Sequence, residues 1–194
     1  MESAIFGLIG VALGSALTVA REWWFQSRKD KKDAEYLAIQ ISCALEQYVA
    51  GCAAVVADDG LCEGQTDERG YYRTQVQPPI FETDSLKVEW KALPGKLMYE
   101  VLDFPYRAEL ASQLVSAAFE FDSPPDFAEG FDERQYQYAM LGIAASDLAE
   151  KLRNHVDLPA RGKGEWDPIA FMKEAKAAIE LRRKERASRA YVAI

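Results

Sequence analysis

The chain has 194 residues, 49% of them hydrophobic, and a formal net charge of −8. Domains commonly hold roughly 100–150 residues, so this length predicts one domain with a single hydrophobic core beside a short anchor. The acidic total argues against nucleic acid as the main partner, because phosphate binding needs concentrated positive charge.

The first residues form an uncharged segment that predicts a single transmembrane helix. Residues 3–20 contain no charged side chain. At 1.5 Å per residue they span about 27 Å, close to the hydrocarbon core of a bilayer. Trp23 and Trp24 follow directly, where an aromatic belt would meet the headgroups. We therefore expect residues 1–24 to be a transmembrane anchor with its aromatic belt, and the lipid bilayer to be a partner.

The basic residues beside this segment predict its orientation. They all follow it: Arg21, Arg28, Lys29, Lys31 and Lys32. With the two tryptophans they form the predicted membrane interface. Positive charge gathers on the cytoplasmic side of membrane helices, so we expect a single-pass protein of the inner (cytoplasmic) membrane with its C-terminal domain in the cytoplasm. Two alternatives stay open: a signal peptide, whose bases should precede the apolar run, and a buried helix of a soluble protein.

Small residues recur along one side of the predicted transmembrane helix. At 100° of rotation per residue, five of them lie within about 80° of one another: Ser3, Gly7, Gly10, Gly14 and Thr18. Small side chains let two membrane helices approach closely. The stripe therefore predicts self-association into a homo-oligomer, or docking onto another membrane helix. The alternative is that Gly and Ala are simply common in such helices.

Residues 25–190 are predicted to be a mainly α-helical cytoplasmic domain. Apolar residues keep helical spacing from 33 to 57, and we expect the anchor to continue into this helix as one rod. Residues 59–93 are an irregular insertion rich in Gly and Pro. Within it, the pattern predicts a small β-hairpin that pairs residues 61–63 with residues 71–76. Residues 86–90 are a second candidate for an extended segment.

Further helices are predicted after Pro94. The first is short, and Pro105 is expected to break it. A second has its apolar residues on one face: Leu110, Leu114, Ala117, Ala118 and Phe121. Asp126 is the expected cap of the clearest helix. The apolar stripe of this helix includes Arg134, a charge that should be paired with an acid or placed at the rim of the bundle. The last helix begins at Asp167-Pro168 and runs into a polar basic tail, residues 182–194. The sequence thus predicts an N-terminal transmembrane helix followed by an antiparallel helical bundle.

No motif predicts catalysis, a cofactor or a metal site. Cys43, Cys52 and Cys62 form no CxxC pair, and the first two should face opposite sides of a helix; we expect reduced core cysteines. His155 is the only histidine, and its place near a helix end favours capping over catalysis. Residues 161–164 lack the leading Gly and the Ser or Thr that a phosphate-binding loop needs. We assign no catalytic, cofactor-binding or metal-binding residue and favour a non-enzymatic role.

Aromatic residues of the irregular insertion are the candidate partner surface. They are Tyr71, Tyr72, Phe81 and Trp90. Exposed aromatic residues amid scattered charge suit a protein interface. The alternative is that they fold back and cap the end of the bundle.

Charge is unevenly distributed along the chain. Residues 103–150 carry ten acids and two bases, whereas residues 173–189 carry seven bases and three acids. This pattern favours helices of opposite charge packed against each other. The alternative is a basic tail held for an anionic partner or for lipid headgroups.

Four short stretches resemble parts of uncharacterised bacterial proteins of similar length that carry an N-terminal membrane helix. They are Glu35-Tyr36-Leu37-Ala38, Asp58-Asp59-Gly60-Leu61, Leu97-Met98-Tyr99-Glu100 and Glu133-Arg134-Gln135-Tyr136. The resemblance implies a bacterial origin, a membrane helix and a helical cytoplasmic domain. It implies no active site.

Two functions are compatible with these patterns. The favoured one is a membrane-anchored helical interaction or scaffold protein that binds a protein partner. The alternative is a membrane-bound enzyme or small-ligand-binding bundle that uses its carboxylates and Arg134. An enclosed polar pocket with Arg134 facing convergent acids would favour the second.

Overall fold

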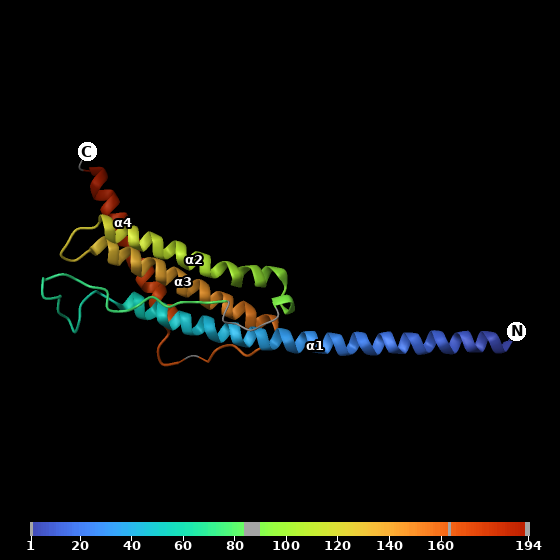
Figure 1. Cartoon of the computed structure of the whole chain (residues 1–194). Coiled ribbons are helices and arrows are strands. Elements are labelled where there is room, and N and C mark those ends of the chain that lie inside the picture. The colour runs from blue at the N-terminus through green and yellow to red at the C-terminus, as the bar shows by residue number, and fades with distance from the viewer. Residues whose placement is uncertain (1, 84–89, 163, 193–194) are drawn as a thin grey trace.

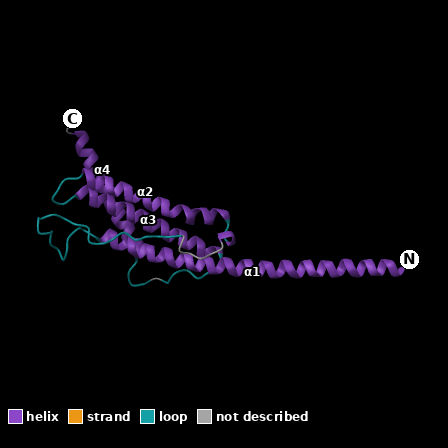
Figure 2. Ribbon diagram, viewed as in Figure 1, coloured by secondary structure: helices purple, strands orange, loops and turns teal. Residues whose placement is uncertain are grey.

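The computed structural model describes residues 2–83, 90–162 and 164–192 (Figure 1). Its elements are α1 (Glu2–Ala57), the 3-10 helix η1 (Trp90–Ala92), α2 (Gly95–Phe121), α3 (Ala128–His155) and α4 (Pro168–Val192). The prediction of a mainly α-helical protein is confirmed. Figure 2 shows helices joined by loops, with no strand among the described residues.

The third helix is the centre of the bundle. α1, α2 and α4 each pack against α3, and α1 also contacts α4 and η1. At Gly142, α3 lies in close contact with both α1 and α4. A side chain at this position would collide with Met172 of α4 and Cys52 of α1. Beside α1 and α2 the insertion adds Phe81 to the core. The bundle is thus completed by a loop as well as by helices.

The first helix has two different halves. From Ala34 onwards it contributes buried side chains, including Leu37, Ile41 and Leu45, to the core. Its N-terminal half projects beyond the other helices (Figure 1), and the described side chains between Gly14 and Lys32 are all exposed. We call residues 2–32 the arm. The expected continuous rod is confirmed, because one helix runs from the arm into the bundle.

The second helix departs from the prediction in two ways. α2 runs through Pro105 without a break. Its core face is formed by Val101, Phe104, Ala111 and Val115, whereas the face predicted for the core is mostly exposed. That outer face includes Leu110, Leu114 and Phe121. α2 therefore carries apolar residues on two faces, and the sequence pattern selected the outer one.

The predicted hairpin is wrong. Among the described residues of the insertion there is only an isolated bridge, between Cys62 and Gln65, and no strand. The backbone that should have paired across a hairpin bonds elsewhere: Arg73 N–H donates to Gly60 O, and Tyr72 N–H donates to Pro125 O. Residues 84–89 lie outside the described part, so the proposed extended segment at 86–90 is described only at Trp90, which begins η1.

The basic C-terminal stretch is helical through Val192. Arg182 pairs with Asp132, and Arg183 pairs with Glu133, across the contact between α4 and α3. This is the packing of oppositely charged helices that the charge pattern favours.

Candidate functional surfaces

The arm presents apolar and basic side chains to the outside. Leu17, Val19 and Trp23 are all exposed. One turn further on, Arg28 lies over the ring of Trp24, with its guanidinium carbon 4.0 Å from the ring centroid. Such a pairing suits a membrane interface, where an aromatic ring and a base meet the headgroups. The predicted interface residues from Arg21 to Lys32 therefore lie together at the base of the arm.

Length and hydropathy allow this helix to cross a membrane. The stretch Leu17–Ala57 contains a window with mean hydropathy 1.4, and half of that window is buried in the protein. A core helix meets the same criterion, so the exposure of the arm is the more informative observation. Of the small-residue stripe, the structure describes Gly14 and Thr18: the Thr18 hydroxyl donates to Gly14 O at 2.9 Å. Ser3, Gly7 and Gly10 lie in α1, but their surroundings are not described.

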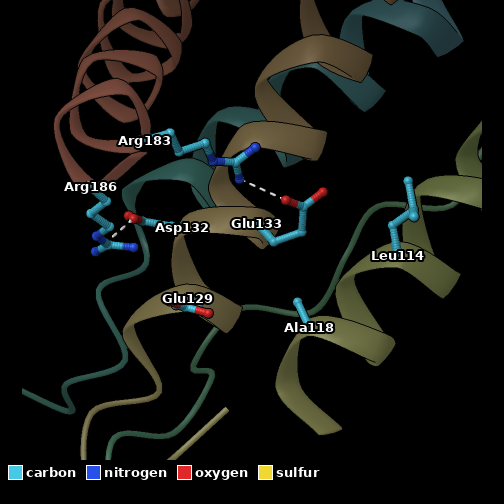
Figure 3. A pocket seen from close by; sticks show the side chains of 7 residues that line it. All are labelled: Leu114, Ala118, Glu129, Asp132, Glu133, Arg183 and Arg186. Atoms are coloured by element: carbon cyan, nitrogen blue, oxygen red, sulfur yellow. Dashed lines mark hydrogen bonds and ion pairs between the residues drawn. The ribbon is translucent and has the colours of Figure 1, made fainter. Parts of the chain in front are cut away.

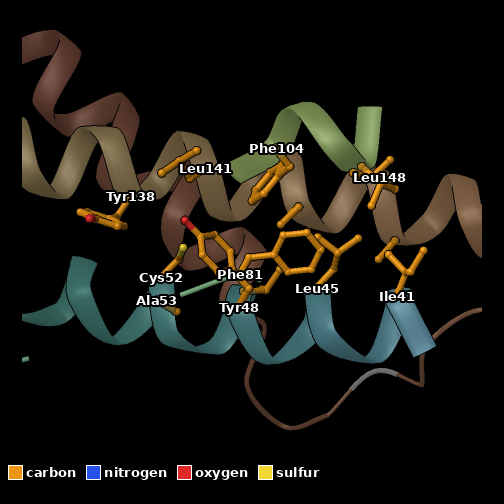
Figure 4. Close-up of a cluster of buried hydrophobic side chains, with 14 of the residues drawn as sticks. Ile41, Leu45, Tyr48, Cys52, Ala53, Phe81, Phe104, Tyr138, Leu141 and Leu148 are labelled. Atoms are coloured by element: carbon orange, nitrogen blue, oxygen red, sulfur yellow. The ribbon is translucent and has the colours of Figure 1, made fainter. Parts of the chain in front are cut away.

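The four aromatic residues of the candidate partner surface pack against the bundle. Phe81 is buried rather than exposed, and its ring meets the rings of Tyr48 and Phe104 edge-on (Figure 4). Tyr71 and Tyr72 are half-buried against Phe127 and Phe131 respectively, and Trp90 is half-buried beside the core. This is the arrangement expected if they cap the bundle.

A buried ion pair joins the insertion to the bundle. Arg134 Nη1 lies 2.9 Å from Asp58 Oδ2, and both side chains are almost fully buried. Arg134 Nη2 donates to Val76 O at 2.5 Å. The same carboxylate accepts the backbone N–H groups of Gly60, Gln75 and Val76. The predicted acidic partner of Arg134 is thereby confirmed and identified as Asp58.

The environment of Asp58 favours its charged form. Burial opposes ionisation, but the three backbone N–H donors and the Arg134 guanidinium outweigh burial and hold the pKa of the Asp58 carboxyl below its usual value. Arg134 faces this one acid and backbone carbonyls rather than a set of convergent acids. The arrangement is that of a structural tie and does not favour the enzyme alternative.

The thiol of Cys52 is buried beside Tyr48 in the core (Figure 4). Burial raises the pKa of Cys52 to about 12 and raises the pKa of Tyr48 above its usual value. A neutral thiol in an apolar core is a weak nucleophile. Cys43 and Cys62 are exposed, so the expectation of core cysteines holds only for Cys52, and Cys43 and Cys52 do face opposite sides of α1.

A groove of about 470 Å³ lies over α3, between α2 and α4 (Figure 3). Leu114 and Ala118 form the α2 wall, and Arg183 and Arg186 form the α4 wall. The floor is acidic: Glu133 pairs with Arg183 at 2.6 Å, while Asp132 pairs with Arg186 at 3.3 Å. One wall is therefore apolar and the other is held by ion pairs. The sequence pattern does not predict this groove, because it places Leu114 on the apolar face expected to pack into the core.

A second hollow, of about 510 Å³, lies between α1, α3 and the loop before α4. Glu46 of α1 pairs there with Arg153 of α3, and at 3.8 Å with Arg161 of the loop. With Glu150 and Asp167 the described lining holds three acids and two bases, so neither sign of charge dominates the hollow. Among the described residues, no group of His, Cys, Asp and Glu side chains gathers as metal ligands would.

The fold and these surfaces define a helical bundle with a projecting N-terminal helix. No protein-family model, no curated protein and no solved structure matches the chain.

Proposed function

We propose that this chain is a membrane-anchored helical interaction or scaffold protein, with the arm in the cytoplasmic membrane and the bundle on the cytoplasmic side. The observation that carries the proposal is the exposure of the arm. All its described side chains from Gly14 to Lys32 are exposed, and large apolar ones such as Leu17 and Trp23 are costly to leave in water. A bilayer would cover them.

The order of residue types along the arm supports the same orientation. The apolar segment comes first, Trp23 and Trp24 follow, and the bases end at Lys32. The first buried side chain in the described part of α1 is Ala34. The bundle therefore begins directly after the predicted headgroup region. A partner bound to the bundle would be held close to the membrane surface.

Alkaline carbonate extraction of membranes tests the anchor. We expect the full-length chain to stay in the pellet, because an inserted helix is not released by breaking electrostatic contacts. The matched control is a chain without residues 2–20, which should be soluble. A reporter fused to the C-terminus that is active only in the cytoplasm tests the orientation. Release of the full-length chain by carbonate, or an inactive cytoplasmic reporter, would contradict the proposal.

A further inference from the structure

The outer face of α2 is an uncovered apolar stripe. Six large apolar side chains follow one another at spacings of three, four or seven residues, which keeps them on one side of a helix. Their exposed fractions are Tyr99 67%, Leu102 43%, Tyr106 63%, Leu110 41%, Leu114 52% and Phe121 84%. We call these six residues the α2 stripe. From Tyr99 to Phe121 it runs about 33 Å, or six turns.

The α2 stripe is separate from the face by which α2 packs into the bundle core. The opposite side of α2 already supplies Val101, Phe104, Ala111 and Val115 to the core. Single exposed apolar residues are ordinary on a protein surface, but a contiguous row of this length marks an interaction site. Toward its C-terminal end, the stripe borders the groove over α3, where Leu114 forms part of the wall (Figure 3). The surface is therefore hollowed beside Leu114 and Ala118.

The charges around the stripe indicate which occupant fits. Asp103, Glu109 and Glu120 lie along α2 within or beside it, and Glu129 lines the adjoining groove. With Glu100, α2 carries four acids against two bases, Lys96 and Arg107. Two further bases of the groove, Arg183 and Arg186, are each paired with an acid of α3. An acidic apolar surface repels anionic headgroups. A second copy of α2 would bring the same acids together, which is also unfavourable.

We propose that the α2 stripe binds an amphipathic helix of a protein partner whose apolar face is flanked by Lys and Arg. The inference rests on the proposed role as an interaction protein and names the surface and the chemistry of its partner. The partner's apolar residues, at helical spacing, lie against Leu110, Leu114 and the aromatic rings. Its bases face Glu109, Glu120 and Glu129. This is the helix-in-groove mode of recognition.

A synthetic helix tests the proposal. The probe is a 22-residue peptide with Leu at helical spacing, Lys on both flanks and one photo-crosslinking residue in its apolar face. It is mixed with the full-length chain in nanodiscs of zwitterionic lipid, with empty nanodiscs as background. Binding is followed by fluorescence anisotropy, and crosslinked sites are mapped by mass spectrometry. We expect crosslinks within residues 99–121 and a binding constant that weakens at least about tenfold in Leu110→Asn with Leu114→Asn.

Two matched controls keep the outcome clear. Leu181→Asn changes a leucine on α4 that is 59% exposed, somewhat more than Leu110 and Leu114, and should leave binding unchanged. A peptide with the same apolar face but Glu flanks should bind the unaltered chain at least about tenfold more weakly. This comparison uses only the unaltered chain, so it does not depend on the folding of a variant. Equal binding of both peptides, crosslinks outside residues 99–121, or a dimer that the double variant dissolves would each overturn the proposal. The same measurements on the full-length chain in mild detergent need no inserted anchor, so this proposal and the membrane anchor can fail separately.

Discussion

Asp58 and Arg134 tie three segments together through one buried contact. Arg134 comes from α3, Asp58 follows the end of α1, and the carboxylate holds the backbone of Gln75 and Val76 in the insertion. Removing one partner of such a pair leaves the other charge buried and uncompensated. That commonly costs about 3–5 kcal/mol, whereas an exposed pair contributes about 0–1 kcal/mol.

Asp58→Ala is therefore expected to lower the free energy of unfolding by about 3–5 kcal/mol, measured by urea denaturation in mild detergent. The control is Glu100→Ala, which breaks the pair between Glu100 and Lys151, whose side chain is more than half exposed. The control should cost no more than about 1 kcal/mol. If both variants lowered the free energy of unfolding by the same amount, the buried pair would contribute no more to stability than the exposed one.

The same pair gives the stability a pH dependence of known sign. The pKa of Asp58 is lowered in the folded state, so its contribution is fully present above the unfolded value of about 3.9 and is lost as the pH falls through the folded pKa. In Asp58→Asn this part of the acid-induced loss should disappear, which a denaturation series from pH 6 downward would show. An unchanged slope would assign the acid sensitivity to other carboxyls.

The place of Arg134 in an apolar stripe predicted either an acidic partner or a position at the rim of the bundle, and the buried pair with Asp58 selects the first. The identity of that acid was not predictable, because Asp58 lies 76 residues away and many acids precede α3. The candidate partner surface stays a prediction, but the packing of its aromatic rings against the bundle was not predictable for a related reason. Phe81 has the residue type of an interface anchor, but aromatic rings bury as readily in a core as in an interface.

At the scale of elements, the turn after α1 depends on Gly60. Its φ is +82°, in the left-handed region, and a Cβ there would collide with the ring of Phe131. Gly60→Ala should therefore combine the backbone cost of about 1–2 kcal/mol with an overpacking cost of about 1–3 kcal/mol. Thermal unfolding followed by circular dichroism measures the sum.

Gly64 provides the control for this prediction. Its φ is +78°, almost the same, but nothing lies within 4 Å of the position a Cβ would take. Gly64→Ala should show the backbone cost alone, about 1–2 kcal/mol. If both variants lost the same stability, Phe131 would have moved aside, and the contact between the turn and α3 would be looser than the structure shows.

Periodicity located the helical regions, because helical spacing is a local property of the sequence, but the predicted break at Pro105 divided α2, which is one helix. It did not select the core face of α2, since both faces are apolar and the choice depends on which face fits α3. It also failed for the hairpin. The insertion satisfies its backbone through Asp58, Gly60 and Pro125, and such contacts with distant residues leave no local signature.

At the scale of the molecule, one helix fixes the bundle relative to its anchor. α1 has 56 residues, about 84 Å of helix at 1.5 Å per residue. Because α1 continues without a break from the arm into the bundle, the direction of the arm sets the direction of the bundle. Two copies whose arms pack side by side would carry their bundles in parallel, each with its own α2 stripe. Self-association would thus double the partner sites without needing a contact between bundles.

The small-residue stripe of the arm is where such self-association is expected. Gly10→Ile with Gly14→Ile adds bulk on the striped side, where close approach of two helices depends on small residues, and should abolish the dimer seen by chemical crosslinking in membranes. Ala12→Ile with Ala16→Ile adds similar bulk about half a turn away from the stripe and should leave the dimer intact. A dimer retained in the Gly10→Ile, Gly14→Ile variant would remove the stripe as an interface. Loss of the dimer in both would show that the whole arm surface takes part, because bulk on either side would then prevent the contact.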